Sequence, residues 1–339
     1  MRRLLMGLTL VFMLLVVGCD VKQYQGPVDS EQTEEVLFTV PAGASTKKIA
    51  TLLAEANLIQ NDWSFVQTVK SEGLDGKLKA GDYKLSKAMD QLQIASTLSS
   101  GKAFVETFKF TIPEGYEFHM IADKLEKEGL IDRATFEQLA QEHPFDYRFL
   151  EGERTYQQRL EGFLFPATYE LKVGADELTI LTAMLDKFDQ VFTDDMYARA
   201  EALGLDVNQV VTLASIVERE SRVAEEFPII ASVFHNRLKD AQKLESCATI
   251  QYLLGERKER LLFKDLEIES PYNTYKNVGL PPAPIASPGE LALTSTLYPA
   301  DTAFLYFVVS GDGDGKHQFS TNYEDHLKAK AIADKKLGN

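Results

Sequence analysis

The chain has 339 residues, 45% of them hydrophobic and 26% charged, a composition that is typical of globular proteins and argues against disorder. Its 36 basic and 51 acidic residues give a net charge of −15, and it contains no basic run or basic–aromatic patch. Nucleic acid is therefore not expected as a partner. The length predicts about two or three domains.

The first 19 residues have the pattern of a bacterial export signal. Two arginines precede an apolar run over residues 4–17, which is shorter than the roughly 20 residues needed to span a bilayer. The sequence Val-Val-Gly-Cys that follows resembles a lipobox, so we expect cleavage before Cys19 and acylation of that cysteine. Residues 20–35 are polar and are expected to tether the protein to the outer face of the cell membrane. The alternative is an uncleaved helix that crosses the membrane once.

The other cysteine, Cys247, has no partner within the chain once Cys19 is lipidated, so no disulfide is expected. No group of cysteines and histidines has the spacing of a metal site. The motifs HExxH and GxSxG and a glycine-rich phosphate loop are also missing from the sequence. We therefore expect neither a metal ion nor a cofactor.

Two segments, 36–105 and 106–190, carry similar sequences at fixed offsets. In the first half of each segment, Phe38 corresponds to Phe110, an offset of 110 − 38 = 72 residues. In the second half, Tyr83 corresponds to Tyr169, an offset of 169 − 83 = 86 residues. The second segment therefore contains an insertion of 86 − 72 = 14 residues, expected around residues 143–160. Such similarity indicates a duplicated structural unit.

Each unit is predicted to run strand, helix, helix, strand and helix. The strand–helix–helix–strand core resembles the LysM class of glycan-binding modules in topology and size. The alternative is a duplicated spacer without affinity for glycan. Trp63, the single tryptophan, could stack on a sugar, but we expect it to pack in the core instead.

A helix is predicted to begin after Asp206, because Asp206 and Gln209 have the spacing of a capping box. Apolar residues then recur at helical spacing, which predicts one buried face. Glu218 and Glu220 end this helix, and a carboxylate wedged among aliphatic side chains has a raised pKa and can serve as a general acid. At about 100° per residue they point roughly 200° apart, so they cannot serve the same cleft. The pattern does not choose between them, and the alternative is that both cross the helix edge to solvent.

The rest of the chain is predicted to be mainly helical, with a hairpin near its end. A helix begins around Pro228, and His235 within it is expected to have a structural role. The loop 270–289 contains five prolines and is suited to holding an extended polar ligand near its start. Residues 304–310 and 317–321 are predicted to form a β-hairpin around a glycine-rich turn.

Five stretches together resemble the endolytic murein transglycosylases of the YceG-like family: EGFLFPATYEL (161–171), LASIVERES (213–221), VFHNRL (233–238), SPYNTYKNVGLPPAPIASPG (270–289) and HQFSTNYEDH (317–326). The resemblance extends from Phe38 to the end of the chain. It implies that LysM-like modules precede a catalytic domain, residues 191–339, and that the catalytic glutamate corresponds to Glu218. The sequence departs from the family where Cys247 stands in place of a common aspartate.

The activity implied by this resemblance needs one carboxyl group, whereas ordinary glycosidases use two. Protonated Glu218 would donate its proton to the glycosidic oxygen between N-acetylmuramic acid and N-acetylglucosamine. The resulting carboxylate would take the proton of the muramyl C6 hydroxyl, which closes on C1 to give a 1,6-anhydro sugar without consuming water. Asn273 and Tyr275, followed by Gln251 and Tyr169, are the candidates for positioning the glycan.

The resemblance further implies that nascent peptidoglycan strands are cut near the membrane, with peptidoglycan synthases as candidate partners. Two alternatives are open. A muramidase would use water and a second carboxylate, such as Glu161, Glu220 or Glu245, and a scaffold lipoprotein would bind the wall without cutting it. For the fold we predict the α+β class, with two small mixed modules followed by a mainly helical catalytic domain that bears a C-terminal β-hairpin.

Overall fold

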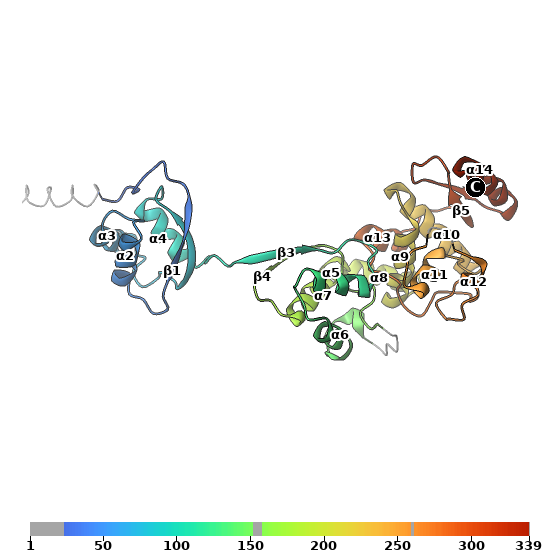
Figure 1. The fold of residues 1–339 in the computed structure, drawn as a ribbon, viewed down its shortest axis with the longest axis horizontal. Helices are drawn as coiled ribbons and strands as arrows, with labels where there is room; N and C mark the ends of the chain where they lie inside the picture. Colours follow the sequence, from blue (N-terminus) through green and yellow to red (C-terminus); the bar gives the residue numbers. More distant parts are fainter. Residues whose placement is uncertain (1–23, 152–157, 259–260, 339) are drawn as a thin grey trace, which may run out of the picture. The chain divides into compact units, whose positions relative to one another are not determined.

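The computed structural model describes residues 24–151, 158–258 and 261–338 (Figure 1). The chain divides into two compact units, with the boundary between Glu106 and Thr107. Both units combine helices with a small antiparallel sheet, in agreement with the predicted α+β class. The predicted export signal and Cys19 lie outside the described residues.

The N-terminal unit has the order strand, helix, helix, strand, helix. Its elements are β1 (Glu35–Val40), α2 (Thr46–Glu55), α3 (Asp62–Ser71), β2 (Gly81–Ser86) and α4 (Gln91–Ser100). The side chains of Ser45, Asn61 and Asp90 cap the three helices, since each accepts a hydrogen bond from a backbone N–H of the first turn. β1 pairs with β2 in antiparallel register, which places Phe38 opposite Tyr83. Both of these side chains are buried in the core of the unit.

The expected core position of Trp63 is wrong. Trp63 lies in the first turn of α3 and is 51% exposed. Phe65 and Val69 occupy the core-facing side of this helix instead, and both are fully buried. Trp63 lines a hollow of about 480 Å³, together with Thr46 and Asp75, whose side chains are joined by a hydrogen bond of 2.7 Å.

The first part of the C-terminal unit repeats the same order of elements. They are β3 (Thr107–Thr111), α5 (Phe118–Lys127), α6 (Arg133–Glu142), the short 3₁₀ helix η1 (Arg148–Leu150), β4 (Thr168–Lys172) and α7 (Glu177–Val191). β3 pairs with β4 in antiparallel register, which places Phe110 opposite Tyr169. In the predicted repeat these residues correspond to Phe38 and Tyr83, so an equivalent cross-strand pair occurs in both segments.

The remaining part is mainly helical. Its elements are α8 (Asp194–Ala202), α9 (Val207–Glu220), the 3₁₀ helix η2 (Ala224–Glu226), α10 (Phe227–Lys239), α11 (Cys247–Leu254), α12 (Phe263–Leu266), α13 (Glu290–Leu297), β5 (Tyr306–Val309), β6 (His317–Ser320) and α14 (Tyr323–Leu337). Helix α9 packs against α8, α10, α11 and α13 and is the central helix of this part. Pro228 lies in the first turn of α10, as predicted. β5 and β6 form the predicted hairpin, with shorter strands than expected.

One hydrophobic core continues through residues 107–339. The predicted domain boundary at residue 190 falls inside this core, because Phe188 and Phe192 on either side of it stack on each other at 5.6 Å between ring centroids. The predicted division into functional domains stays a prediction. The predicted insertion at 143–160 contains η1, and its residues 152–157 lie outside the described part of the chain.

Gly162 lies where three segments of this core meet. Its φ is +84°, and a side chain there would overlap Pro284 and crowd Val211 of α9. We therefore expect Gly162→Ala to lower the free energy of unfolding by about 2–3 kcal/mol, as left-handed backbone and overpacking both cost energy. Urea unfolding measures the loss. Gly174 also has positive φ, +83°, but has open space around it, so Gly174→Ala should cost less, and equal losses would contradict the crowding.

In the described ranges, no single helix is long and apolar enough to cross a membrane. The consecutive helices α8 and α9, bent by 92° at their junction, meet the length and composition criterion only when taken together. Most of α9 is buried in the protein core, which explains its apolar composition.

Candidate active site

Helix α9 is fixed at its start by the predicted capping box. The Asp206 carboxylate accepts a hydrogen bond from the backbone N–H of Gln209 at 2.8 Å, and the Gln209 side chain accepts one from the backbone N–H of Asp206 at 3.0 Å. The eight consecutive residues 210–217 are buried. Glu218 and Glu220 follow in the last turn, where the helix leaves the core.

Glu218 is covered by two loops that come from distant parts of the sequence. Its Oε2 accepts a hydrogen bond from the backbone N–H of Gly289 at 3.0 Å, and Gly115 packs against its side chain. A side chain at Gly289 would overlap the Glu114 carboxylate, so that carboxylate also lies close by. Burial raises the pKa of Glu218 to about 7; the Gly289 hydrogen bond opposes this and the Glu114 charge adds to it.

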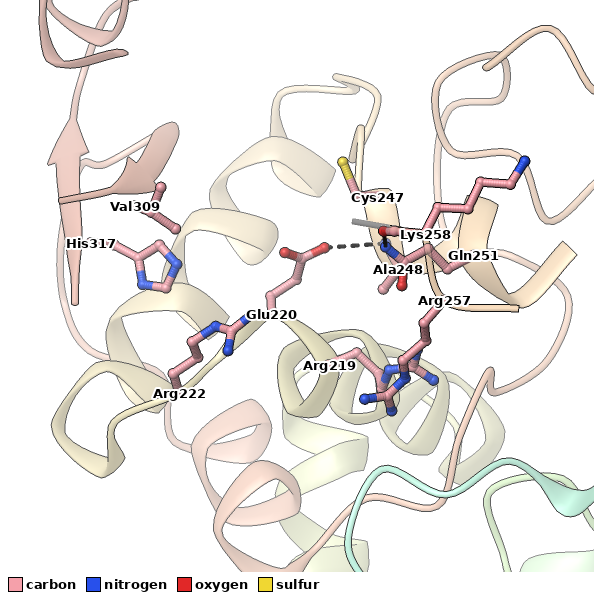
Figure 2. Close-up of a pocket in the computed structure, with 10 residues that line it drawn as sticks. All are labelled: Arg219, Glu220, Arg222, Cys247, Ala248, Gln251, Arg257, Lys258, Val309 and His317. Carbon is pink, nitrogen blue, oxygen red and sulfur yellow. Dashed lines mark hydrogen bonds between the residues drawn. The ribbon is translucent and has the colours of Figure 1, made fainter. Parts of the chain in front are cut away.

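Glu220 lies on another side of α9, at a hollow of about 530 Å³ (Figure 2). Its carboxylate accepts a hydrogen bond from the Ser246 hydroxyl at 2.5 Å and a longer one from the Ala248 N–H at 3.4 Å. Ser246 caps α11 and Ala248 lies in its first turn, so the carboxylate meets the positive end of a helix dipole. The hollow is also lined by Arg219, Arg222, Cys247, Gln251, Arg257, Lys258, Val309 and His317. Glu218 is not among the lining residues, in agreement with the predicted angular separation of the two glutamates.

The proline-rich loop 270–289 holds the start of α11 in place. Asn273 is fully buried, and its Nδ2 donates hydrogen bonds of 2.8 and 2.9 Å to two backbone carbonyls. The hydroxyl of the next residue, Thr274, accepts a hydrogen bond from the backbone N–H of Ser246 at 3.0 Å. The loop thereby positions the serine hydroxyl that binds Glu220.

A sequence model of the YceG-like family matches residues 38–332. The chain belongs to the YceG-like family. An endolytic murein transglycosylase of Bacillus subtilis is 34% identical to it over 314 residues, which cover 90% of this chain and 86% of the relative. An endolytic murein transglycosylase of Streptococcus pneumoniae is 31% identical over 327 residues, which cover 88% of this chain and 58% of the relative.

A solved structure resembles the same chain. It is the crystal structure of a YceG-like protein from Listeria monocytogenes, which is 33% identical and superposes with a TM-score of 0.59. The match covers 87% of this chain and 98% of the Listeria chain. The fold described above is therefore a fold of the YceG-like family.

Two of the four residues predicted to position a ligand line hollows beside Glu220 in this YceG-like chain. Gln251 lines the hollow described above, and its Nε2 donates a hydrogen bond to the Lys258 carbonyl at 3.3 Å. Tyr275 lines an adjoining hollow of about 510 Å³, which Glu220 also lines. The Tyr275 hydroxyl lies 3.1 Å from the Cys247 sulfur.

The other two, Asn273 and Tyr169, are buried. Asn273 uses its amide to hold the loop, and the Tyr169 hydroxyl on β4 donates to the backbone carbonyl of Phe165. The Tyr169 ring stacks on Phe110 at 5.1 Å between centroids. These surroundings favour a role in shaping the protein over contact with a ligand, and the predicted contact with glycan stays a prediction for both residues.

A buried ion pair joins the repeated segment to α9, and it was not predicted from the sequence. Arg219 Nη1 lies 2.7 Å from Glu117 Oε1, and the side chains are only 5% and 6% exposed. Glu117 precedes α5, whereas Arg219 directly precedes Glu220. The two partners lie 102 residues apart in the sequence, and no local pattern could have paired them. Ser246, in contrast, could have been found as the N-cap of the predicted helix.

Glu161, one of the carboxylates proposed for a hydrolytic mechanism, is buried at the start of α5. Its two oxygens accept hydrogen bonds from the backbone N–H of Phe118 at 3.0 and 3.2 Å. The pKa of Glu161 is raised to about 8, mainly because the group is buried. The hydrogen bonds from Phe118 lower this pKa, whereas the charge of Glu117 raises it. It lines a different hollow from Glu220, together with Tyr252.

This raised pKa predicts a pH-dependent stability. The neutral form of Glu161 is favoured in the folded chain, so its contribution is complete below pH 4.5 and is lost as the pH rises toward about 8. Glu161→Gln, which is neutral at every pH, should therefore gain stability relative to the unchanged protein by at most about 1.4 kcal/mol per pH unit over this window. Urea unfolding of both proteins between pH 5 and 8 measures this difference in stability. A difference that stays constant with pH would contradict the burial of a titrating carboxyl group.

Proposed function

We propose that this protein is an endolytic lytic transglycosylase that cuts peptidoglycan between N-acetylmuramic acid and N-acetylglucosamine and leaves 1,6-anhydromuramyl ends. The observation that carries the proposal is the half-buried Glu218, whose pKa burial raises to about 7, in a chain whose relatives are named endolytic murein transglycosylases. The relatives' names supply the substrate and reaction class, and the hollow lined by the neighbouring Arg219 and Glu220 is the proposed place for the strand.

The role of general acid is proposed for Glu218, as the family resemblance implies. A general acid works best with a pKa near the working pH, and burial raises the pKa of Glu218 to about 7. The side chain is half-buried, between the Gly289 amide and the loop of Gly115, and is not fully enclosed. Glu220 instead accepts hydrogen bonds from Ser246 and Ala248 at the start of α11, which suits a role in positioning.

In the proposed reaction, protonated Glu218 gives its proton to the glycosidic oxygen as the bond from that oxygen to C1 of the muramyl residue breaks. The muramyl C6 oxygen then forms a bond to C1, and the Glu218 carboxylate accepts the C6 hydroxyl proton. The acid is regenerated, no water is consumed, and one carboxyl group serves both steps. The Gly289 N–H is suited to orient this group, because it donates a hydrogen bond to Glu218 Oε2.

Gln251 and Tyr275 remain the candidates for glycan positioning. Each lines a hollow that contains Glu220 and carries polar atoms that can bind sugar hydroxyl or acetamido groups.

The products of peptidoglycan digestion test the proposal. The soluble form that starts after Cys19 should release fragments with anhydromuramyl ends, detected by mass spectrometry. Reducing muramyl ends would indicate a muramidase, for which Glu220 and Glu245, which line one hollow, and Glu161 are the candidate second carboxylates. Binding without any cleavage would support the scaffold alternative.

We further propose that Cys19 is acylated and holds the protein at the outer face of the cell membrane, where nascent strands and their synthases occur. The apolar run before Cys19 and the polar tether after it support this anchor. Metabolic labelling with an alkyne fatty acid should mark the protein but not its Cys19→Ser variant. Equal labelling of the unchanged protein and the variant would contradict acylation of Cys19.

The N-terminal LysM-like unit is proposed to bind glycan through the Trp63 hollow. An exposed indole beside hydrogen-bonding side chains suits the apolar face and polar rim of a sugar ring. Because Trp63 is the single tryptophan, its fluorescence should change on addition of peptidoglycan strands. Trp63→Ala should weaken binding by about tenfold, in the range found for single stacked rings. Unchanged fluorescence and binding would favour the spacer alternative.

A further inference from the structure

Basic side chains are concentrated at the Glu220 hollow of a strongly acidic protein. The whole chain carries a charge of −15, yet four cationic residues line this one hollow: Arg219, Arg222, Arg257 and Lys258. Among its lining residues Glu220 is the sole carboxylate. The hollow therefore differs in charge from the protein as a whole.

Two of the four cations have protein partners. Arg219 is paired with Glu117 at 2.7 Å, and Lys258 with Asp265 at 3.1 Å. Each ion pair balances the positive charge of its arginine or lysine and fixes the position of that side chain.

The other two, Arg222 and Arg257, have no ion-pair or hydrogen-bond partner among the residues that the structure describes. Figure 2 shows Arg222 on one side of Glu220 and Arg257, beside Arg219, on the other. Partial burial first, and then the charges of Arg219 and Arg222, lower the pKa of Arg257, so these cations are close enough to repel one another. Such a cluster favours a bound anion, which would relieve the repulsion.

We propose that Arg222 and Arg257 bind an oxyanion carried by the glycan strand, namely a carboxylate of the peptides attached to its muramyl residues. The inference rests on the proposed function. A guanidinium group binds carboxylate or phosphate through paired hydrogen bonds, and sugar rings themselves offer no charge to it. The enzyme would thereby select peptide-bearing strands over strands whose peptides have been removed.

The diphosphate that joins a nascent strand to its lipid is the other source of such an oxyanion. It occurs once, at the end of the strand, whereas peptides occur along the whole strand. An endolytic cut lies inside the strand, so arginines in a hollow at the catalytic end of α9 would meet peptides and not the diphosphate. Arg222 and Arg257 lie on the two sides of Glu220, which fits peptides on successive muramyl residues.

Initial rates on three purified substrates test the proposal. They are uncross-linked strands with peptides, the same strands after peptide removal by an amidase, and peptide-free strands that keep the lipid diphosphate. The unchanged protein should prefer peptide-bearing strands by about tenfold or more in kcat/KM, as expected for one or two charge-assisted contacts. Arg222→Gln and Arg257→Gln should each reduce this preference about fivefold, mainly through KM, because one such contact is lost.

A matched control and salt separate specific contacts from net charge. Lys172→Gln removes one positive charge from an exposed position on β4 and should keep the full preference. Raising the salt concentration should reduce the preference of the unchanged protein more than that of Arg222→Gln.

Three results would overturn the proposal: equal kcat/KM of the unchanged protein on the first two substrates, equal losses of the arginine variants on both, or a preference for the lipid-linked strands without peptides. The last result would assign the arginines to the diphosphate. If the unchanged protein cuts none of the three substrates, the proposed function itself fails, which is a different outcome from loss of the preference alone.

Discussion

Glu218→Gln is expected to lower the rate of strand cutting by about 10²–10⁴-fold, the usual contribution of a general acid and base. The amide has nearly the same shape and can still accept a hydrogen bond from the Gly289 N–H, but it has no proton of suitable acidity to give to the glycosidic oxygen. The variant should therefore fold and bind strands normally. The measurement is the initial rate of release of soluble fragments from purified strands, with thermal unfolding as the check on folding.

Glu220→Gln is the matched control, because it makes the same change two residues away in the same helical turn. Its amide oxygen can still accept the hydrogen bond of the Ser246 hydroxyl. We expect most of the activity to remain. If Glu220→Gln is inactive and Glu218→Gln is active, the acid is Glu220, and the assignment to Glu218 is wrong.

The second large effect is expected from the buried ion pair of Glu117 and Arg219. Glu117→Gln should lower the free energy of unfolding by about 3–5 kcal/mol, because it leaves the charge of Arg219 in a buried position without its partner. Urea unfolding measures the loss. Replacing both residues, Glu117→Gln with Arg219→Gln, should recover part of it, since the double variant no longer holds an unpaired charge.

The exposed pair of Glu170 and Lys109 provides the control for this second prediction. Its nitrogen and oxygen lie 3.2 Å apart, but the side chains are more than half exposed, so Glu170→Gln should change the stability little. A similar loss in Glu170→Gln and Glu117→Gln would contradict the importance of burial. If the loss of the double variant equals the sum of the losses of Glu117→Gln and Arg219→Gln, the predicted coupling of the two residues is also contradicted.

Features set by local sequence were predicted well. The capping box of Asp206 and Gln209 depends on residues three positions apart, and it begins α9 as expected. The repeat offsets aligned Phe38 with Phe110 and Tyr83 with Tyr169, and both cross-strand pairs follow from that alignment. The hairpin was visible because a glycine-rich turn separates two segments of β-forming residues.

Features set by tertiary contacts were not predicted. Helical periodicity placed Glu218 and Glu220 at the two borders of the same apolar face, so it could not choose between them. The loops that carry Glu114 and Gly289 cover Glu218 and leave Glu220 at the hollow, and both loops are distant in sequence. The position of Trp63 was wrong for a related reason, since Phe65 and Val69 already fill the core beneath α3.

The most direct test of the account is digestion of purified strands in water enriched in ¹⁸O, by the unchanged protein and by Glu218→Gln in parallel, followed by mass spectrometry of the new muramyl ends. The account predicts ends that are lighter by one water and carry no ¹⁸O, formed by the unchanged protein and nearly absent from the variant. One ¹⁸O atom in each new end would show that water completes the reaction, and anhydro ends formed at full rate by Glu218→Gln would show that another group is the acid. Either result would contradict the account.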